Sequence, residues 1–306
     1  MVDVGKDPVR KIAITGGTGL IGSALRSSLE ARGCELALIS RSSSKADVNW
    51  DIDEGSFDAS PLEGFDAIIH LAGEPIAQRW TGEVRERIYS SRINSTRLLV
   101  DGLSKLREPP KVFLSASGIN YYPSTDFGAG LNEKAESGEG FLSRVCRHWE
   151  AEAQKAASFV PRVCFLRTAV VLASGGGALS KLVPVFKAGV GGRVGTGEQP
   201  FPWISIRDYV GACEHLLFDS DLSGPINLVA PERVDNRTFS KTLGKVLNRP
   251  AVLPVPKTAV KVVFGEMGLS TLMEGVDAIP GKLENDGYRF VDPELAAALE
   301  GILNSE

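Results

Sequence analysis

The sequence predicts an α/β protein with a doubly wound, parallel Rossmann sheet and a smaller C-terminal substrate lobe. Three observations favour this fold class. Short β-branched apolar runs alternate with helical patterns, a glycine-rich turn joins the first run to the first helix, and 306 residues exceed what one ordinary core fills. In such folds a ligand binds at the carboxyl edge of the sheet, so we look for functional residues there.

The first elements follow from local patterns. Residues 11–15 are an apolar run that predicts the first strand, and helical spacing of apolar residues predicts a helix over 20–32. Gly33 is expected to end this helix as its C-cap. Residues 35–40 predict the second strand.

Further along the chain the alternation continues. A nearly all-apolar strand is predicted at 65–72, followed by a long helix over 83–106 that must end before Pro109. Two more buried strands are predicted at 112–115 and 163–166. These elements complete a parallel sheet covered on both faces.

Beyond residue 171 the pattern changes. Glycine clusters at 175–177 and 189–197 predict loops with a short helix between them, which we expect to cover a site. A helix over 209–218 with Asp208 as its cap, and a strand at 226–229, return to the main sheet. From Pro231 onward, the pattern predicts small helices separated by prolines.

Composition excludes several classes of partner. The net charge of −4, from 34 basic and 38 acidic residues, offers no basic face for nucleic acid, and no run approaches the roughly 18 apolar residues of a membrane span. The four cysteines form no CxxC pair and the three histidines lack metal-ligand spacing, so we expect no metal site. Unpaired cysteines suit a reducing compartment, and we expect a cytoplasmic protein.

The strongest motif is the GxxGxxG turn formed by Gly16, Gly19 and Gly22. Glycine at the first position permits a tight turn, at the second a close approach to a pyrophosphate, and at the third close packing of helix on strand. The helix N-terminus then supplies free N–H groups for the phosphate. We expect this turn to bind a dinucleotide, with Thr18, Leu20 and Ile21 beside the glycines.

The end of the second predicted strand distinguishes NADP from NAD. An acidic residue there would bind the adenosine ribose and exclude a 2′-phosphate, but the sequence has Arg41 followed by Ser42 and two further serines. A guanidinium and hydroxyls are donors that a phosphate prefers. The sequence therefore predicts NADP(H). The NADP-binding domain is expected over 1–172, with 200–230 returning to it, and 173–306 is expected to form mainly the substrate lobe and a C-terminal helical extension.

With these motifs the sequence resembles the extended short-chain dehydrogenase/reductase superfamily, in its NAD-dependent epimerase/dehydratase group. Residues 15–22 match the opening fingerprint, and 70–73 look like the turn beneath the nicotinamide-side ribose. Over the whole chain it is similar to an atypical subgroup, the epimerase family proteins with an added C-terminal domain and a cell-division-inhibitor-like label. The resemblance implies cofactor contacts at a second set of positions: Arg41, Leu71, Ala72, Gly73, Arg92 and Val171.

The same resemblance implies a catalytic serine, and a tyrosine with a lysine four residues later on one helix, whose ammonium lowers the tyrosine's pKa. Ser117 matches the serine. If Glu150 aligns with the glutamate that follows the lysine, however, Cys146 replaces the lysine and Leu142 the tyrosine. The sequence offers as substitutes Tyr121 or Tyr122 after the strand, or Arg144, Arg147 and His148 on the helix. We assign proton transfer to Tyr121, while a packing role for the two tyrosines stays open.

These observations predict an NADP(H)-binding oxidoreductase or epimerase-like protein acting on a small carbonyl or hydroxyl substrate, without the usual Tyr-Lys pair. The alternative is a non-catalytic NADP(H)-sensing protein that acts through a protein partner; an epimerase with tightly held cofactor is a third reading. The sequence leaves the substrate, the reaction direction and a homodimer open.

Overall fold

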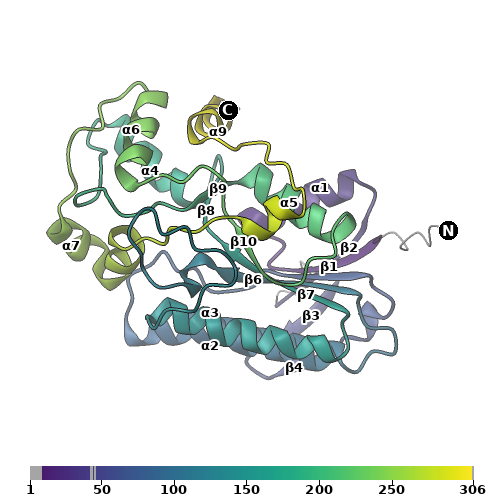
Figure 1. The fold of residues 1–306 in the computed structure, drawn as a ribbon. Coiled ribbons are helices and arrows are strands. Elements are labelled where there is room, and N and C mark those ends of the chain that lie inside the picture. The colour runs from purple at the N-terminus through teal and green to yellow at the C-terminus, as the bar shows by residue number, and fades with distance from the viewer. Residues whose placement is uncertain (1–8, 42–43, 45, 305–306) are drawn as a thin grey trace.

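A parallel sheet forms the centre of the molecule (Figure 1), in a computed structural model that describes residues 9–41, 44 and 46–304. Among these residues, eight strands form this sheet: β1 Lys11–Thr15, β2 Glu35–Ser40, β3 Val48–Asp51, β4 Ser56–Phe57, β5 Ala67–His70, β6 Val112–Gly118, β7 Arg162–Thr168 and β10 Gly224–Leu228. Their order is β10-β7-β6-β5-β1-β2-β3-β4, and every neighbouring pair except β3–β4 is parallel. The strand order reverses between β1 and β5, where a doubly wound fold binds its ligand.

Helices cover both faces of this sheet (Figure 1). Helices α1 Leu20–Ala31 and α5 Ile206–Phe218 pack on one face, around Leu25, Leu29 and Leu216. Helices α2 Gly82–Leu103 and α3 Phe141–Gln154 pack on the other, around Leu99 and Ala153. Because both faces are buried, the strands are apolar throughout rather than alternating.

A second lobe has its own small core. Strand β8 Val170–Leu172 pairs in parallel with β9 Trp203–Ser205. Around this pair and Trp203 pack α4 Gly177–Lys187, α6 Asn236–Val246 and α9 Leu295–Asn304. The other helical segments are α7 Lys257–Gly268, α8 Gly281–Asn285 and four short turns at Ser60–Leu62, Ile119–Tyr121, Lys155–Ser158 and Leu269–Met273.

The predicted fold class is confirmed, and several element boundaries differ. The strand predicted at 65–72 is shorter, since only Ala67–His70 pair with neighbours, and the long second helix ends at Leu103 rather than 106. Strands β3 and β4 were not predicted, because they have only four and two residues and an alternating or exposed pattern. Short edge strands carry little local signal.

Asp208 was wrongly predicted to cap α5. The cap is Ser205, whose Oγ accepts a hydrogen bond from the Asp208 N–H at 3.0 Å. The Asp208 carboxylate is fully buried and accepts instead from the N–H groups of Val291 and Asp292, at 2.7 and 2.8 Å. This residue therefore anchors the C-terminal segment to the helix.

Two more buried carboxylates hold the C-terminal segment against the main sheet. Asp277 accepts hydrogen bonds from the N–H groups of Gly128 and Gly130, and Glu133 accepts from the N–H of Lys282. Residues 276–290 also contribute apolar side chains to the core that α1 and α5 form with the sheet. The domain boundary at 172 stays a prediction, because this late segment returns to the main body.

No helix in the described part of the chain combines the length and apolar character needed to cross a membrane.

Candidate functional site

The glycine turn between β1 and α1 has a geometry that other residues could not adopt. Gly16 has a φ of +69°, and a methyl group built on it would lie 3.0 Å from the carbonyl carbon of Leu71. A methyl group on Gly22 would lie 2.3 Å from the carbonyl oxygen of Gly16. The left-handed φ of Gly16 and the 2.3 Å approach at Gly22 both disfavour any side chain, so the turn depends on glycine at both positions.

The same turn leaves the N-terminus of α1 open. Gly19 is the N-cap residue and, having no side chain, it caps none of the first helical N–H groups. Thr18, Gly19 and Leu20 are exposed, and a methyl group on Gly19 would meet only the Gly16 carbonyl oxygen, at 3.4 Å. Free N–H groups and a helix dipole at an uncovered turn suit a pyrophosphate, so these residues fit a dinucleotide.

At the end of β2 the described residues favour a phosphate over a ribose hydroxyl pair. Arg41 directly follows the strand and is exposed. The predicted contact Ser42 lies outside the described residues. Asp47, the acidic residue later in this loop, accepts a hydrogen bond from the Leu38 N–H at 2.7 Å and so serves the local backbone.

A buried histidine holds the turn after β5. Thr15 Oγ1 accepts hydrogen bonds from the N–H groups of Leu71 and Ala72, at 3.0 and 3.1 Å, so its own hydrogen points to His70 Nδ1, at 2.7 Å. His70 Nε2 then carries the ring hydrogen and donates to Thr96 Oγ1 at 2.9 Å. Burial, with a smaller contribution from Arg92, lowers the pKa of His70 to about 3. The ring is therefore neutral at physiological pH. Through Thr15 it positions Leu71 and Ala72, two predicted cofactor contacts.

This histidine predicts a loss of stability in acid. Its pKa in the folded protein is below the ordinary 6.5, so between these values the unfolded chain binds more protons and unfolding becomes easier as the pH falls. We expect His70 to contribute a slope of up to about 1.4 kcal/mol per pH unit between about pH 6.5 and 3. Urea unfolding across this range should show a shallower slope in His70→Gln. His148→Gln, on a partly exposed face, is the control; equal slopes in wild type and His70→Gln would contradict the prediction.

The predicted contact Arg92 is buried behind the same turn. Its Nη1 donates to the carbonyl oxygens of Glu74 and Ile88, both at 3.0 Å, and its guanidinium lies 5.1 Å from the ring centre of Trp149. A methyl group on Gly73 would lie 3.1 Å from Cζ of Arg92. Arg92 thus places a charge at the end of β5, directly beneath the exposed Gly73. Val171 is half-buried in β8 and packs against the core that α1 and α5 form with the main sheet.

The two helix positions where a tyrosine and a lysine were expected carry no proton-transfer group. Leu142 is buried in an apolar cluster with Trp80 and Met267. Cys146 is buried, with 6% of the residue exposed, and this burial raises the pKa of its thiol to about 11. At neutral pH its thiol is protonated and uncharged, so it replaces neither the ammonium nor a nucleophile.

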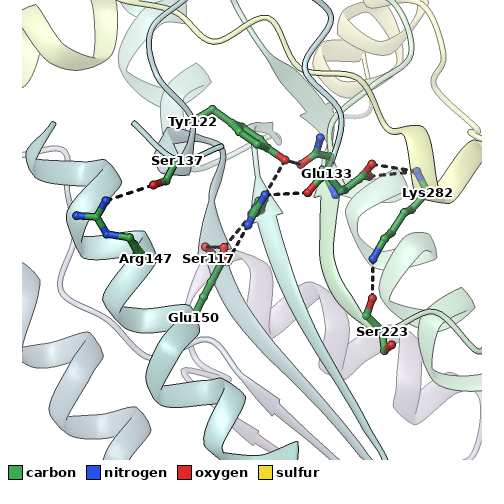
Figure 2. Close-up of polar contacts among 10 residues, drawn as sticks. Ser117, Tyr122, Glu133, Ser137, Arg147, Glu150, Ser223 and Lys282 are labelled. Carbon is green, nitrogen blue, oxygen red and sulfur yellow. Dashed lines mark hydrogen bonds and ion pairs between the residues drawn. The ribbon is translucent and has the colours of Figure 1, made fainter. Parts of the chain in front are cut away.

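Ser117, at the end of β6, is the first member of a buried polar network (Figure 2). Its hydroxyl donates to Glu150 Oε1 at 2.7 Å, and Glu150 also accepts from Arg167 Nε and Nη2, at 2.9 and 2.8 Å. The Arg167 and Glu150 side chains are only 4% and 9% exposed. Burial alone would lower the pKa of Arg167, but the hydrogen bonds and charge of Glu150 raise it overall. Ser117 is itself only 5% exposed, and its hydrogen is held by a carboxylate.

The network continues across the sheet to the C-terminal segment. Arg167 Nη1 donates to the Tyr122 hydroxyl at 2.8 Å, and that hydroxyl donates to Asn227 Oδ1 at 2.8 Å. The Asn227 N–H donates to Glu133, which also accepts from the N–H of Lys282. Figure 2 shows Ser117 and Glu150 on one side of this network and Glu133 and Lys282 on the other. The end of β6 is thus connected to α8 by hydrogen bonds.

The predicted catalytic Tyr121 lies beside this network. Its ring packs against the guanidinium of Arg167, with 3.4 Å from Cζ to the ring centre, and edge-on against Tyr122 at 5.4 Å. Tyr121 is half-buried, whereas Tyr122 is 1% exposed. Of the two tyrosines, Tyr121 is therefore the more accessible.

A cavity of about 180 Å³ opens next to these residues. Its walls come from three segments that are distant in the sequence: Asn120 with 122–124 after β6, 139–143 at the start of α3, and 274–276; neither Ser117 nor Tyr121 lines it. The cavity lies beyond the end of β6, on the side of the sheet away from Arg41. A small substrate could be bound there, with the C-terminal segment as one wall.

Sequence reasoning missed the ion pair and the third wall of the cavity. A charged residue inside an otherwise apolar strand, as Arg167 is in β7, was an available signal, because a buried guanidinium needs a partner. For its partner Glu150, the sequence indicates only an alignment with a family position on the helix. Nothing in the local pattern of 274–276 shows which distant residues it meets.

Comparison with known proteins gives consistent matches. A sequence model of the NAD dependent epimerase/dehydratase family matches residues 12–228, and one of a domain of unknown function, DUF1731, matches residues 255–302. Epimerase family protein SDR39U1 of Homo sapiens is 37% identical over 297 residues, which cover 96% of this chain and 99% of that protein. Epimerase family protein YfhF of Bacillus subtilis is 34% identical over 298 residues, with 95% and 97% covered. The crystal structure of human SDR39U1 (isoform 2) with NADPH superposes with a TM-score of 0.88 at 35% identity, covering 97% of this chain and all of that one.

Proposed function

The chain belongs to the NAD dependent epimerase/dehydratase family, and from this premise we propose that it binds NADPH and transfers a hydride between it and a small carbonyl or hydroxyl substrate. The observation that carries the proposal is the turn 16–22, whose helix end is open to a phosphate while its backbone admits only glycine at two positions. The nicotinamide, when bound, supplies the hydride chemistry. The similar human protein was crystallised with NADPH, which supports this choice of cofactor.

The residues that would hold the cofactor lie along the carboxyl edge of the sheet. In a doubly wound fold the dinucleotide spans the point where strand order reverses, here between β1 and β5. The adenosine half therefore belongs over β1 and β2, beside Arg41, and the nicotinamide half over β5 and β6. The proposed contacts are Gly16, Thr18, Gly19, Leu20, Ile21, Gly22, Arg41, Leu71, Ala72, Gly73, Arg92 and Val171.

Arg41→Glu is expected to reverse the preference between cofactors. The guanidinium offers charge-assisted hydrogen bonds to a 2′-phosphate, and a carboxylate would repel that phosphate while accepting from ribose hydroxyls. Loss of such a bond corresponds to roughly a tenfold to hundredfold weaker NADPH binding. Fluorescence titration with NADPH and NADH measures both affinities, and Arg289→Glu at another exposed arginine is the control. An unchanged ratio in Arg41→Glu would show that the end of β2 does not select the cofactor.

Hydride transfer is tested by following NADPH absorbance with a panel of aldehydes, ketones, alcohols and nucleotide sugars. In this proposal Tyr121 gives a proton to a substrate carbonyl oxygen, or takes one from a substrate hydroxyl, as the hydride moves, and Ser117, whose hydrogen Glu150 holds, accepts a hydrogen bond from the substrate hydroxyl. We expect turnover with at least one substrate, reduced at least about tenfold in Ser117→Ala and Tyr121→Phe. Turnover that both variants retain would remove these residues from the mechanism.

The missing Tyr-Lys pair on α3 favours a second function, in which NADPH is a regulatory ligand. Both positions where the Tyr-Lys pair was expected are buried and hold Leu142 and a protonated Cys146, so the usual proton donor is missing. A protein of this kind could bind NADPH as a regulatory ligand and act through a protein partner. Tight NADPH binding without turnover across the panel, together with a partner captured only in the presence of NADPH, would favour this function over hydride transfer.

We also propose that the protein is cytoplasmic. Cys34, Cys146, Cys164 and Cys213 all lie in the described part of the chain and are free thiols, three of them buried, which suits a reducing compartment. Fractionation of cells with an antibody against the protein tests this placement; recovery in an organelle or membrane fraction would contradict it.

A further inference from the structure

Arg92 is a buried cation without a carboxylate partner of its own among the described residues. Its hydrogen bonds go to two main-chain carbonyl oxygens, and only 8% of the residue is exposed. The nearby carboxylate of Glu74 is engaged elsewhere, since it accepts from Gln78 and pairs with Arg87 at 3.8 Å. Main-chain dipoles solvate the guanidinium but do not cancel its unit charge.

The other groups around the ends of β5 and β6 leave this charge uncompensated. His70 is neutral, Cys146 is a protonated thiol, and the carboxylate of Glu150 is neutralised by the two hydrogen bonds from Arg167. The described surroundings therefore carry a net charge of about +1, located at Arg92. Arg92 lies beneath Gly73, at the end of β5. This is the nicotinamide side of the reversal in strand order between β1 and β5.

The two redox states of the cofactor differ in charge at just that half. The oxidised nicotinamide is a cation and the reduced one is neutral, whereas the phosphates are the same in both. We infer that Arg92 makes this site selective for NADPH over NADP⁺, an inference that rests on the proposed binding of the dinucleotide along the sheet edge. In a protein interior of effective dielectric about 20, two like charges within one site repel strongly enough for a ratio of about tenfold or more.

This selectivity has a consequence for both proposed functions. By thermodynamic linkage, a tenfold preference for the reduced form raises the two-electron potential of the bound couple by about 30 mV, which makes bound NADPH a weaker hydride donor. The same charge suits a protein that reports the ratio of NADPH to NADP⁺. Its site would hold mainly NADPH when the reduced form dominates. A charge at Arg92 therefore suits the sensing function better than rapid hydride donation.

The test compares dissociation constants of NADPH and NADP⁺ by isothermal titration calorimetry. For the wild-type protein we expect NADP⁺ to bind at least about tenfold more weakly. Arg92→Met should bring the ratio close to one, and Arg92→Lys, which keeps the charge, should retain most of it. Arg97→Met removes an exposed arginine of the same helix, paired with Glu152 at 2.9 Å, and should leave the ratio unchanged.

The outcomes separate this inference from the proposed function. If neither form of the cofactor binds, the proposed function fails. If both bind the wild-type protein equally well, the inference is wrong and the proposed function stands, whatever the variants do. A ratio that stays high in a folded Arg92→Met also overturns it. Should Arg92→Met fail to fold, the wild-type ratio and its retention in Arg92→Lys decide the question.

Discussion

Replacing Arg167 by methionine is expected to destabilise the protein by about 3–5 kcal/mol, the usual cost of removing one partner from a buried ion pair. Arg167 makes two hydrogen bonds to Glu150 and one to the Tyr122 hydroxyl. Without it, the Glu150 carboxylate remains buried and, among the described side chains, keeps the hydrogen bond from the Ser117 hydroxyl but loses its counterion, which is costly for a buried charge. Urea unfolding, followed by far-UV circular dichroism, measures the change.

The double variant Arg167→Met, Glu150→Leu is the matched control. It removes both charges together and leaves apolar side chains in their place, which is often neutral or even stabilising. We expect it to recover more than half of the stability that Arg167→Met loses. A double variant as unstable as the single one would indicate that packing or the Tyr122 contact, rather than the uncompensated charge, accounts for the loss.

Gly22→Ala is expected to abolish NADPH binding and to destabilise the fold by about 3 kcal/mol or more. The added methyl group would lie 2.3 Å from the Gly16 carbonyl oxygen and 2.6 Å from Gly17 Cα, and backbone atoms cannot yield as a flexible side chain can. The turn must then open and separate the N-terminus of α1 from the end of β1. Thermal unfolding and fluorescence titration measure both effects.

Two other glycines distinguish the turn's shape from its ligand. Gly19→Ala adds a methyl group that meets only one atom, at 3.4 Å, so the fold should stay intact while a pyrophosphate loses its close approach. Gly82→Ala, in the first turn of α2 with nothing within 4 Å, should leave the affinity unchanged and stabilise the fold by no more than about 1 kcal/mol. NADPH affinity that Gly19→Ala leaves unaltered would place the phosphates somewhere other than this turn.

Much of the fold could be predicted because its signals are local. The strand Lys11–Thr15, the helix after the glycine turn and the strand Glu35–Ser40 are found where the apolar periodicity placed them. Parallel pairing followed from their alternation, since a strand, a helix and a strand in sequence form a right-handed parallel unit. Strands of two to four residues, such as β4, escaped because so short a run has no period.

Some residues of the candidate site could be assigned from the local sequence, and others only from tertiary packing. Gly16, Gly22 and Arg41 could be assigned from the sequence because a tight turn and the residue after a strand depend on a few consecutive positions. Arg92 was proposed from resemblance alone, and its burial beneath Gly73 appears only when α2 packs on the sheet.

The sequence by itself determined the Rossmann architecture, the dinucleotide turn and the absence of a tyrosine and lysine on α3, because each is a matter of residue type and short spacing. The tertiary structure alone decided that Glu150 pairs with Arg167, that Tyr122 meets Asn227 105 residues later, and that 274–276 closes the cavity. The physical reason is that a buried charge or hydroxyl must find a partner wherever packing places one. That choice depends on which helix and strand come together, and no local pattern in the chain records it.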